Sequence, residues 1–456
     1  MERSRAEHCY TSGSISRHFA GLVFPLVLGN ILQQFYNTVD AAVVGRYAGV
    51  EEFAAIGVAS SIMNLFLFAA AGACVGLAVL FAGAYGKGDF GEFRKLHALS
   101  FAYGGLYFLL LGLLGLAGVS GLLRVVQTPE YIACYVKSYL IIVLAGLPFS
   151  FFYNLYSAVL RSVGRAGVSL VILAGAVIFN LFLDIFFVRD LSMGVEGAAI
   201  ATVLSQVVSA AVSWLFIRLR CPQLMFRRKD LSWDRAYLSK IGRYALVTAL
   251  QQCGLYVGKL LVQGTVNSQG TNIIAAFTAA GRMEAFVNSF GDSGAAATAV
   301  IVAQNYGAGK QERVRRAFEI SFLSLCVFGL LSSLFMGFVA RQACGWLLGT
   351  ASGAACDSAV TYIRLISCYY IFCFSGNTFA GYYDGIGRVK ITFLGTVSHI
   401  SLRVLLSYLF IDRMGLAAVA HASGIGWICV NIFWAVLLFI WIKKLSNRTE
   451  KSAWER

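Results

Sequence analysis

Two carboxylates lie inside otherwise apolar stretches of this chain, where a charge is costly. Asp40 follows a polar run that contains Asn37. Asp184 follows Asn180 by four residues, so these two side chains share one face of a helix, and Thr202 lies in the next apolar stretch. Carboxylate, amide and hydroxyl oxygens form a hard ligand set that suits a proton or Na⁺. We therefore predict a cation-binding site formed by Asp40, Asn180, Asp184 and Thr202, with Na⁺ as the metal ion that would fit.

A second interpretation uses the same acids as structural ion pairs. A charge in the hydrocarbon core costs about 2.5–3.5 kcal/mol even on lenient insertion scales, so each acid needs a partner or a function. Asp40 would pair with Arg46, and Asp184 would pair with Arg189. Spacing along the chain does not show which helices touch, and both interpretations therefore stay open at this point.

Five further acids lie in or beside apolar stretches. Glu284 and Asp292 accompany Lys259 and Arg282. An internal ion pair of Lys259 with Glu284 is the structural interpretation of this group, and a second coupling site is the functional one. The remaining acids are close to expected helix ends, where we predict interfacial positions; they are Glu196, Glu319 and Asp384.

The elements that carry these residues are transmembrane helices. Hydrophobic residues make up 58% of the chain and charged residues 13%. Apolar runs of about 20 residues recur along the whole length, and each is long enough to cross a core of roughly 30 Å. The runs do not alternate in polarity as the strands of a membrane β-barrel do. We predict an all-α integral membrane protein with spans centred near residues 32, 67, 108, 145, 178, 206, 254, 287, 328, 370, 401 and 429.

The net charge of +15 is an orientation signal rather than a sign of nucleic-acid binding. With twelve spans, 27 of the 37 Lys and Arg fall in the termini and in the loops on their side, and five fall in the opposite loops. The positive-inside rule then places both termini in the cytoplasm. We expect a multi-pass protein of the plasma (inner) membrane, and the basic start at residues 1–17 does not have the pattern of a removable signal peptide.

The chain contains the same unit twice. Residues 82–101 and 303–322 align without gaps at an offset of 221, and both contain Y-G-x-G followed by two basic residues and Ser-Phe. Six spans per copy make the copies parallel repeats, related by a pseudo-two-fold axis along the membrane normal. The domains that we predict are a six-helix lobe at 1–217, a cytoplasmic linker at 218–243, a second six-helix lobe at 244–445 and a cytoplasmic tail at 446–456.

The prolines, cysteines and histidines give less information about structure and function than the acids do. Pro25 and Pro148 are the prolines inside spans, and each removes one backbone hydrogen bond and permits a kink. The 11 Cys form no C-x-x-C pair and the five His have no ligand spacing. No H-E-x-x-H or similar arrangement is present, so we expect neither an enzyme nor a cofactor.

Several motifs, in order, give the chain a family likeness. The first span reads P-L-V-L-G-N-I-L-Q-Q-F-Y-N-T-V-D and is followed by V-G-R-Y-A-G and A-A-I-G-V-A. The Y-G-x-G loops, L-R-S-V-G-R, and N-L-F-L-D with M-G-V-E-G-A-A-I-A-T come after them. Across about residues 15–445 the chain resembles the multidrug and toxic compound extrusion (MATE) family, in its bacterial branch.

The resemblance implies two six-helix lobes around a central cavity that opens alternately to each side, with drug export driven by inward H⁺ or Na⁺. It places the cation site of the first lobe on the four residues already named. The bending proline of the family corresponds to Pro25. Lys259 departs from the family pattern, so no cation site is carried over to Glu284 and Asp292. The drug contacts of the family correspond to Gln34 and Asn154, and more loosely to Tyr36, Asn37 and Tyr139.

We therefore expect a cation-coupled antiporter for multidrug efflux, with H⁺ or Na⁺ as coupling ion and no cofactor. Its partners would be membrane lipid and small organic cations or drugs, with no nucleic acid, and it would act as a monomer. The alternative is a lipid-linked saccharide flippase of the same superfamily. A flippase needs a strongly cationic cavity, whereas the first six spans contain almost no Lys or Arg.

Overall fold

The computed structural model describes residues 10–350 and 352–454. Within these ranges it leaves the side chains of Asn37, Ala41, Val125 and most residues after 440 undescribed. Helices account for nearly all the described residues, and none of these residues forms a strand. The all-helical prediction is therefore confirmed.

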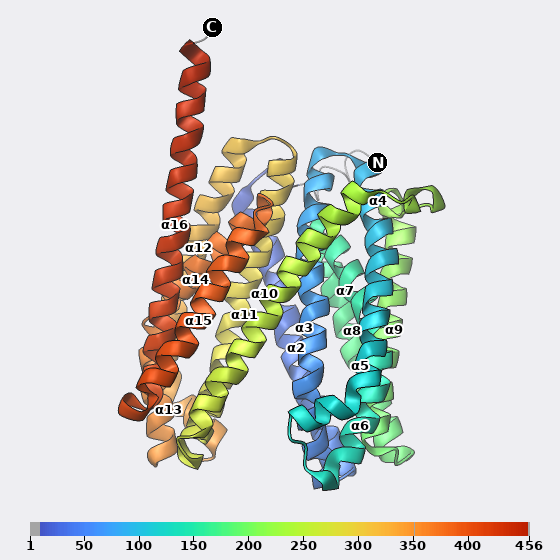
Figure 1. The fold of residues 1–456 in the computed structure, drawn as a ribbon, viewed down its shortest axis with the longest axis vertical. Coiled ribbons are helices and arrows are strands. Elements are labelled where there is room, and N and C mark those ends of the chain that lie inside the picture. The colour runs from blue at the N-terminus through green and yellow to red at the C-terminus, as the bar shows by residue number, and fades with distance from the viewer. Residues whose placement is uncertain (1–9, 351, 455–456) are drawn as a thin grey trace. The chain divides into compact units, whose positions relative to one another are not determined.

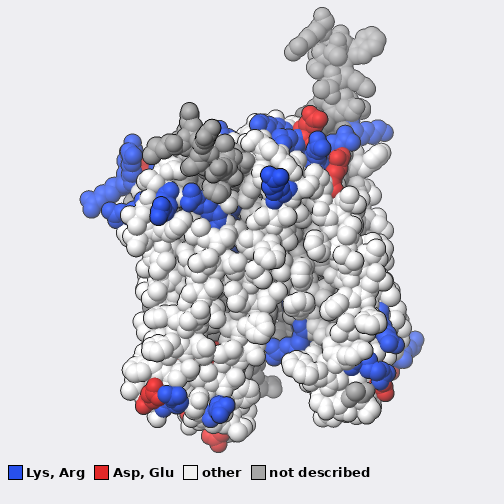
Figure 2. Space-filling model, turned by 180° about the vertical axis from the view of Figure 1, so that it is seen from behind, with Lys and Arg blue, Asp and Glu red and all other residues white. Residues whose placement is uncertain are grey.

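In the described part of the chain, ten helices are long and apolar enough to span a membrane, and two further pairs qualify together although each is bent. With each bent pair taken as one span, the count is twelve. The spans lie at the twelve predicted centres, so the chain is a multi-pass membrane protein. Figure 2 shows one face of it, with charged side chains mainly toward the ends of the helices and few on the flanks between.

The first six spans contain helices α2 to α9 and are followed by two short 3₁₀ turns (Figure 1). Their bounds are α2 (Ile15–Tyr47), α3 (Val50–Lys87), α4 (Phe90–Leu99), η1 (Ser100–Gly104), α5 (Gly105–Val125), α6 (Glu130–Ala145), α7 (Leu147–Ser162), α8 (Ala166–Asp184), η2 (Ile185–Asp190), α9 (Gly194–Arg220), η3 (Pro222–Leu224) and η4 (Arg228–Leu231).

The remaining six spans contain helices α10 to α16. Their bounds are α10 (Arg235–Asn267), α11 (Thr271–Gly307), α12 (Gln311–Leu348), α13 (Ala354–Ser367), α14 (Tyr370–Gly385), α15 (Val389–Met414) and α16 (Leu416–Trp454).

Two compact units form, each considered by itself. The first comprises residues 1–256 and 300–314, and the second comprises residues 257–299 and 315–456. The borders therefore fall inside α10, α11 and α12. The lobe and linker boundaries given by the repeat remain a prediction.

The two Y-G-x-G segments terminate helices α3 and α11. Gly88 has a φ of +74° and Gly309 a φ of +72°, a conformation that glycine adopts without strain. The N–H of Gly88 donates to the carbonyl of Tyr85 at 3.0 Å, and that of Gly309 to the carbonyl of Tyr306 at 3.1 Å. The repeated motif is thus a helix-ending turn in both copies.

The bent pairs occur at corresponding places in the two repeats. The axes of α6 and α7 differ by 47°, and those of α13 and α14 differ by 51°. Pro148 lies in the first turn of α7, but Ile371 takes the corresponding place at an offset of 223. The bend therefore belongs to the repeated architecture and does not require a proline.

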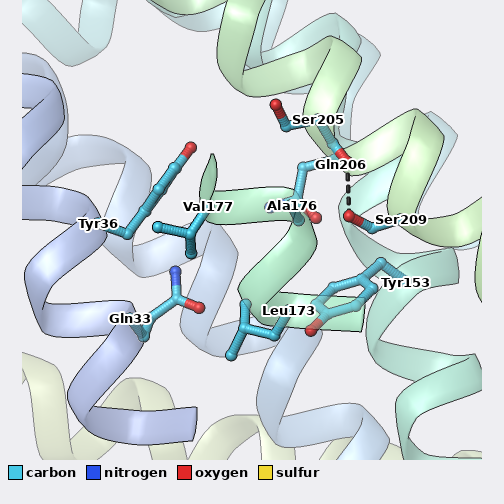
Figure 3. A pocket seen from close by; sticks show the side chains of 9 residues that line it. All are labelled: Gln33, Tyr36, Tyr153, Leu173, Ala176, Val177, Ser205, Gln206 and Ser209. Atoms are coloured by element: carbon cyan, nitrogen blue, oxygen red, sulfur yellow. Dashed lines mark hydrogen bonds between the residues drawn. The ribbon is translucent and has the colours of Figure 1, made fainter. Parts of the chain in front are cut away.

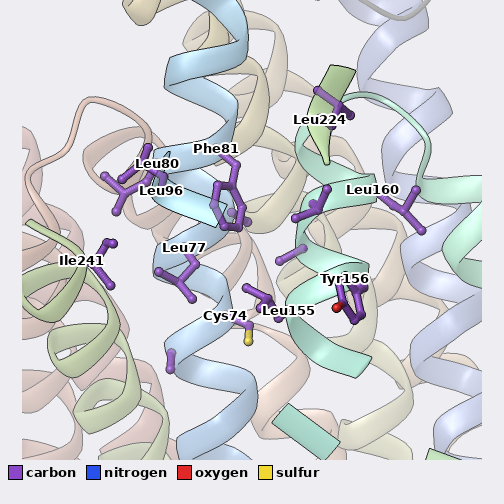
Figure 4. Packing of buried hydrophobic residues seen from close by; sticks show 14 of the residues in the cluster. Cys74, Leu77, Leu80, Phe81, Leu96, Leu155, Tyr156, Leu160, Leu224 and Ile241 are labelled. Atoms are coloured by element: carbon purple, nitrogen blue, oxygen red, sulfur yellow. The ribbon is translucent and has the colours of Figure 1, made fainter. Parts of the chain in front are cut away.

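The core of the first unit is built around α3. Phe81 and Leu77 of this helix are fully or almost fully buried and pack with Leu155 of α7 and Ile241 of α10 (Figure 4). Glycine brings α10 close to α3, because a Cβ at Gly76 would lie 2.6 Å from the carbonyl oxygen of Tyr244. Small residues allow such close helix crossings in membranes.

The N-terminal segment of the first unit is held to the end of α11 and the start of α12. The N–H of Tyr10 donates to Gln304 Oε1 at 2.8 Å. Arg313 donates through Nη2 to the carbonyl of Tyr10 at 3.1 Å and through Nε to Asn305 Oδ1 at 3.0 Å. It also contacts the carbonyl of Gly13 at 3.2 Å. The guanidinium of Arg313 therefore holds the backbone of residues 10–13 to Asn305.

Candidate functional site

Asp40 and Asp184 face one another inside the first unit. Asp40 lies on α2 and Asp184 is the last residue of α8, two helices that pack together. The side chains are 8% and 0% exposed, respectively. Their carboxyl groups are close enough to share a hydrogen bond when one of them carries a proton. The sequence placed these acids on separate spans, and the fold brings them together.

Hydroxyl groups surround the acid pair. Tyr36, one turn before Asp40, forms a hydrogen bond of 3.2 Å with Thr202 Oγ1 of α9. Tyr139 of α6 is buried and faces both carboxyl groups and Thr202. Asn180 lies one turn before Asp184 and is 2% exposed. The four residues predicted as a cation site are thus gathered by α2, α8 and α9.

Three of the four carboxyl oxygens of the pair have no donor among the described residues. Asp40 Oδ1 and both oxygens of Asp184 are buried without a hydrogen-bond partner, and so is the amide nitrogen of Asn180. Two carboxylates about 4 Å apart repel by roughly 4 kcal/mol at an effective dielectric constant of about 20. A buried ionised pair therefore requires a proton or a bound cation to neutralise it.

The ion-pair interpretation of the two acids is wrong. Arg189 Nε donates to Asp190 Oδ1 at 2.7 Å, so this arginine is paired with its chain neighbour. The guanidinium of Arg46 lies over the ring of Tyr47, 5.9 Å from its centroid. Neither arginine neutralises the buried pair.

The backbone after Asp184 is irregular. Residues 185–190 form the π-helical turn η2, although α8 up to this point is a regular α-helix. Such turns carry one extra residue per turn and occur often at functional sites. The irregularity places the carboxyl group of Asp184 at a junction rather than within a continuous helix.

A small pocket opens beside Tyr36 (Figure 3). Its volume is about 20 Å³, which holds about one water molecule. Tyr36 and Gln33 reach it from α2, and the rest of its lining comes from α7, α8 and α9. None of the lining residues is charged; they are Gln33, Tyr36, Tyr153, Leu173, Ala176, Val177, Ser205, Gln206 and Ser209.

Comparison with known proteins identifies the family. The MatE family model matches residues 25–186 and 248–409, once in each repeat. The chain belongs to the MatE family. This is a family of multidrug efflux transporters, and the sequence resemblance is thereby confirmed.

Three relatives show the extent of the likeness. "Probable multidrug resistance protein YpnP" of Bacillus subtilis is 27% identical over 314 residues, which cover 67% of this chain and 68% of the relative. "Probable multidrug resistance protein NorM" of Thermotoga maritima is 23% identical over 453 residues, which cover 96% and 94%. A crystal structure described as MATE in complex with MaL6 is 23% identical, with a TM-score of 0.89 and coverage of 96% of this chain and 98% of that one. The last likeness shows the fold.

The predicted drug contacts of this MatE protein lie at different places. Tyr36 and Tyr139 lie at the acid pair, and Tyr36 also lines the pocket. Gln34 is exposed, and the amide of Asn154 donates to the carbonyl of Ser150 on its own helix at 2.8 Å. The side chain of Asn37 lies outside the described ones. The pocket is lined instead by the chain neighbours of Gln34 and Asn154, which are Gln33 and Tyr153.

The sequence reasoning missed the polar face of α9. Ser205, Gln206 and Ser209 line the pocket, and Ser205 Oγ and Gln206 Oε1 are buried without a partner among the described residues. With Thr202 they occupy positions i, i+3, i+4 and i+7, which is one face of a helix. The sequence contains this spacing, but uncharged polar side chains cost little in an apolar span and therefore indicate a site less strongly than acids do.

The remaining acids of this MatE protein need one correction. Glu284 does not pair with Lys259, because its Oε1 is buried without a partner among the described residues, and Lys259 interacts with Asp292 instead. Asp384 lies at the end of α14, close to a helix end as predicted, and its side chain is buried there. Glu319 is exposed and pairs with Arg315 at 2.8 Å, as expected for a residue outside the hydrocarbon. Glu196 is also exposed.

Proposed function

We propose that this MatE protein is a cation-coupled antiporter that exports drugs or other organic cations by alternating access, with H⁺ or Na⁺ as coupling ion. The observation that carries the proposal is the buried pair Asp40 and Asp184. Three of its four oxygens have no donor among the described residues, and an apolar helical bundle surrounds it. A binding site for an exchangeable cation supplies the missing charge.

Tyr36 links the coupling ion to the transported molecule. Its hydroxyl bonds to Thr202 beside the acids, and its ring lines the pocket. Occupancy of either site therefore changes the surroundings of a side chain that both sites share. Coupling requires such a difference in binding free energy between the two conformations of a transporter.

Pro25 is the hinge that we propose for α2. The helix continues across Pro25 as one element from Ile15 to Tyr47. Proline donates no backbone hydrogen bond, which lowers the cost of bending at that turn. Asp40 lies 15 residues further along the same helix, roughly 22 Å away at 1.5 Å per residue. Binding of a proton or Na⁺ at Asp40 can therefore shift the equilibrium between a straight and a bent conformation of α2.

The pocket favours organic cations. Tyr36 and Tyr153 present aromatic rings whose faces attract cations, and no Lys or Arg is among the lining residues. Ligand sites for drug-sized molecules have volumes of about 300–1,000 Å³. The pocket of about 20 Å³ must therefore widen to admit a drug. In the proposed mechanism, the change of conformation between the two states of the transporter widens it.

Orientation and partners follow from the same proposal. We place the protein in the inner membrane with both termini cytoplasmic, as a monomer that contacts lipid and small molecules. A flippase for lipid-linked saccharides is not favoured, because relatives of this chain are named as multidrug resistance proteins and the pocket lacks basic side chains.

Efflux of a fluorescent organic cation from proteoliposomes tests the proposal. A pH gradient and a Na⁺ gradient are imposed separately on vesicles that contain the purified chain. Uphill movement of the dye with one gradient, and none with either gradient in protein-free vesicles, is the expected result. Equal dye movement with and without both gradients would show a uniporter and overturn the proposal.

A further inference from the structure

The second repeat rebuilds the framework of the acid site. α8 begins at Ala166 and α15 at Val389, an offset of 223. The bent pair α13 and α14 corresponds to α6 and α7 at the same offset, to within a residue at each end of the first helix. Residues 223 apart therefore hold corresponding positions in helices that occur in the same order with a similar bend.

Different side chains occupy the corresponding positions. Tyr139 is matched by Tyr362, so the tyrosine beside the acids is kept. Asn180 is matched by Arg403, and Asp184 by Ser407. An amide and a carboxylate of the first unit are thus replaced by a guanidinium and a hydroxyl group. No π-helical turn interrupts α15, which is a continuous α-helix to Met414.

Tyr362 and Arg403 form a polar cluster in the second unit together with Glu284 of α11, and Glu284 and Arg403 are half-buried. Tyr362 is fully buried, and its hydroxyl group faces both the carboxyl group of Glu284 and the guanidinium of Arg403. Glu284 is not a repeat copy of Asp40, because it reaches the cluster from a different helix, α11 rather than α10. The second unit therefore supplies one carboxylate to a site where the first supplies two.

The cluster is not a closed ion pair. Glu284 Oε1, Arg403 Nε and the hydroxyl oxygens of Tyr362 and Ser407 are all buried, and none has a direct hydrogen-bond partner among the described residues. The ion pairs within 4.0 Å among those residues include neither the acid nor the arginine. A structural salt bridge that compensates the burial of its charges would need such direct bonds. The groups are instead arranged around each other with polar atoms unpaired.

The other ionisable groups around the cluster do not supply a second cation. Tyr370 and Cys373 interact with Glu284, and Asp292 lies beside Cys373. His399 interacts with Arg403 and stacks on the ring of Trp427 at 5.9 Å between centroids. Lys259 interacts with Asp292. Arg403 is thus the cation that shares Tyr362 and Cys373 with Glu284 among the described residues.

We propose that Arg403 is a tethered cation that takes the place of the coupling ion in the second unit. This inference rests on the function proposed above, since it assumes that the acid pair of the first unit binds an exchangeable cation. The guanidinium balances Glu284 permanently and cannot leave. The second unit then contains the framework of a cation site without an exchangeable ion, and each transport cycle is coupled through the site of the first unit alone.

Arg403→Asn tests the inference, because it gives the second unit the amide that the first unit has at this position. The probe is the coupling ion found in the vesicle assay, measured on purified full-length protein either as bound radioactive Na⁺ or as protons released on addition of tetraphenylphosphonium. We expect one ion per wild-type chain and two per Arg403→Asn chain. Arg403→Lys keeps a tethered cation and should bind one. Arg403→Asn with Glu284→Gln should return to one.

The reverse exchange keeps the inference testable if Arg403→Asn does not fold. Asn180→Arg places a guanidinium beside the acid pair and should reduce the count from one to zero. Asp190→Asn, at an exposed residue that pairs with Arg189 outside the site, should keep one. Equal ion counts for Arg403→Asn and Arg403→Lys, or a count of one for Asn180→Arg, would overturn the inference. An undiminished count in Asp40→Asn would instead contradict the proposed function, so the two failures are distinguishable.

Discussion

Gly76 lies on α3 where this helix meets α10 of the first unit, and replacing it by alanine is expected to destabilise the protein. The glycine allows the two backbones to approach closely. A Cβ at position 76 would lie 2.6 Å from Tyr244 O and 2.6 Å from Thr248 Oγ1. Real Cβ atoms do not approach other atoms so closely, and the carbonyl group of Tyr244 is part of a helix backbone that cannot rotate away.

The change in the free energy of unfolding caused by Gly76→Ala is the difference between two opposing contributions. Overpacking costs about 1–3 kcal/mol, and a clash with backbone places Gly76→Ala near the upper end. Alanine returns about 1 kcal/mol through its higher helix propensity, which leaves a net loss of about 2 kcal/mol. Gly83 on the same helix is a matched control, because a Cβ there would meet only Ala303 O, at 3.9 Å. Gly83→Ala should therefore gain up to about 1 kcal/mol.

Thermal melting of the two purified variants in detergent measures this difference. Gly76→Ala should melt below the wild type and Gly83→Ala at or above it, a separation of about 3 kcal/mol from the two estimates. Melting of both variants at the same temperature would refute the argument that glycine sets the distance between α3 and α10.

Two further predictions concern the polar ends of the first unit. A hydrogen bond of 2.6 Å from Lys95 Nζ lowers the pKa of Asp234, and the backbone N–H groups of Tyr237 and Ala236 contribute to this shift. The ionised carboxylate therefore stabilises the fold above its unfolded pKa of about 3.9. This stabilisation is lost as the pH falls through the folded pKa. Asp234→Asn should accordingly melt below the wild type at neutral pH, with the gap closing below about pH 4, and a gap that stays constant with pH would contradict this assignment. Arg313→Ala removes charged hydrogen bonds that hold residues 10–13, each worth about 1.5–3 kcal/mol, so cleavage by chymotrypsin at Tyr10 should be at least about tenfold faster. Arg315→Ala, which removes only the exposed pair with Glu319, should leave that rate unchanged, and equal rates in both variants would count against the contact.

The fold could be predicted from the sequence largely because the bilayer imposes simple requirements. Apolar runs long enough to span it gave all twelve spans, and the Y-G-x-G repeat located two helix ends, since glycine is needed there for a positive φ. The bend between α13 and α14 was not predicted, because no proline marks it.

The candidate site was predictable where burial makes a charge costly. Asp40 and Asp184 stood out in apolar runs, and the fold brings them together. Ser205 and Ser209 were missed because hydroxyl groups carry little cost in a helix, where they can bond to their own backbone, as Ser209 does to the carbonyl of Ser205 at 2.6 Å. Which helices meet is set by packing, and no spacing within one span encodes it.

The repeat was informative where its copies differ. At the offset of 223 residues, Arg403 takes the position that Asn180 has in the first copy. The fold adds Glu284 and Tyr362 from two other helices. Only a three-dimensional arrangement could show that the second copy contains a cation of its own.

Asp40→Asn in proteoliposomes tests the central claim most directly. The variant removes one of the two buried carboxylates and keeps the size of the side chain, and Asp190→Asn is its matched control because Asp190 is exposed and pairs with Arg189. Asp40→Asn should reach the membrane at the wild-type level and lose gradient-driven efflux of the fluorescent cation, while Asp190→Asn retains it. Undiminished gradient-driven efflux by Asp40→Asn would contradict the claim that the acid pair of the first unit couples transport to a cation.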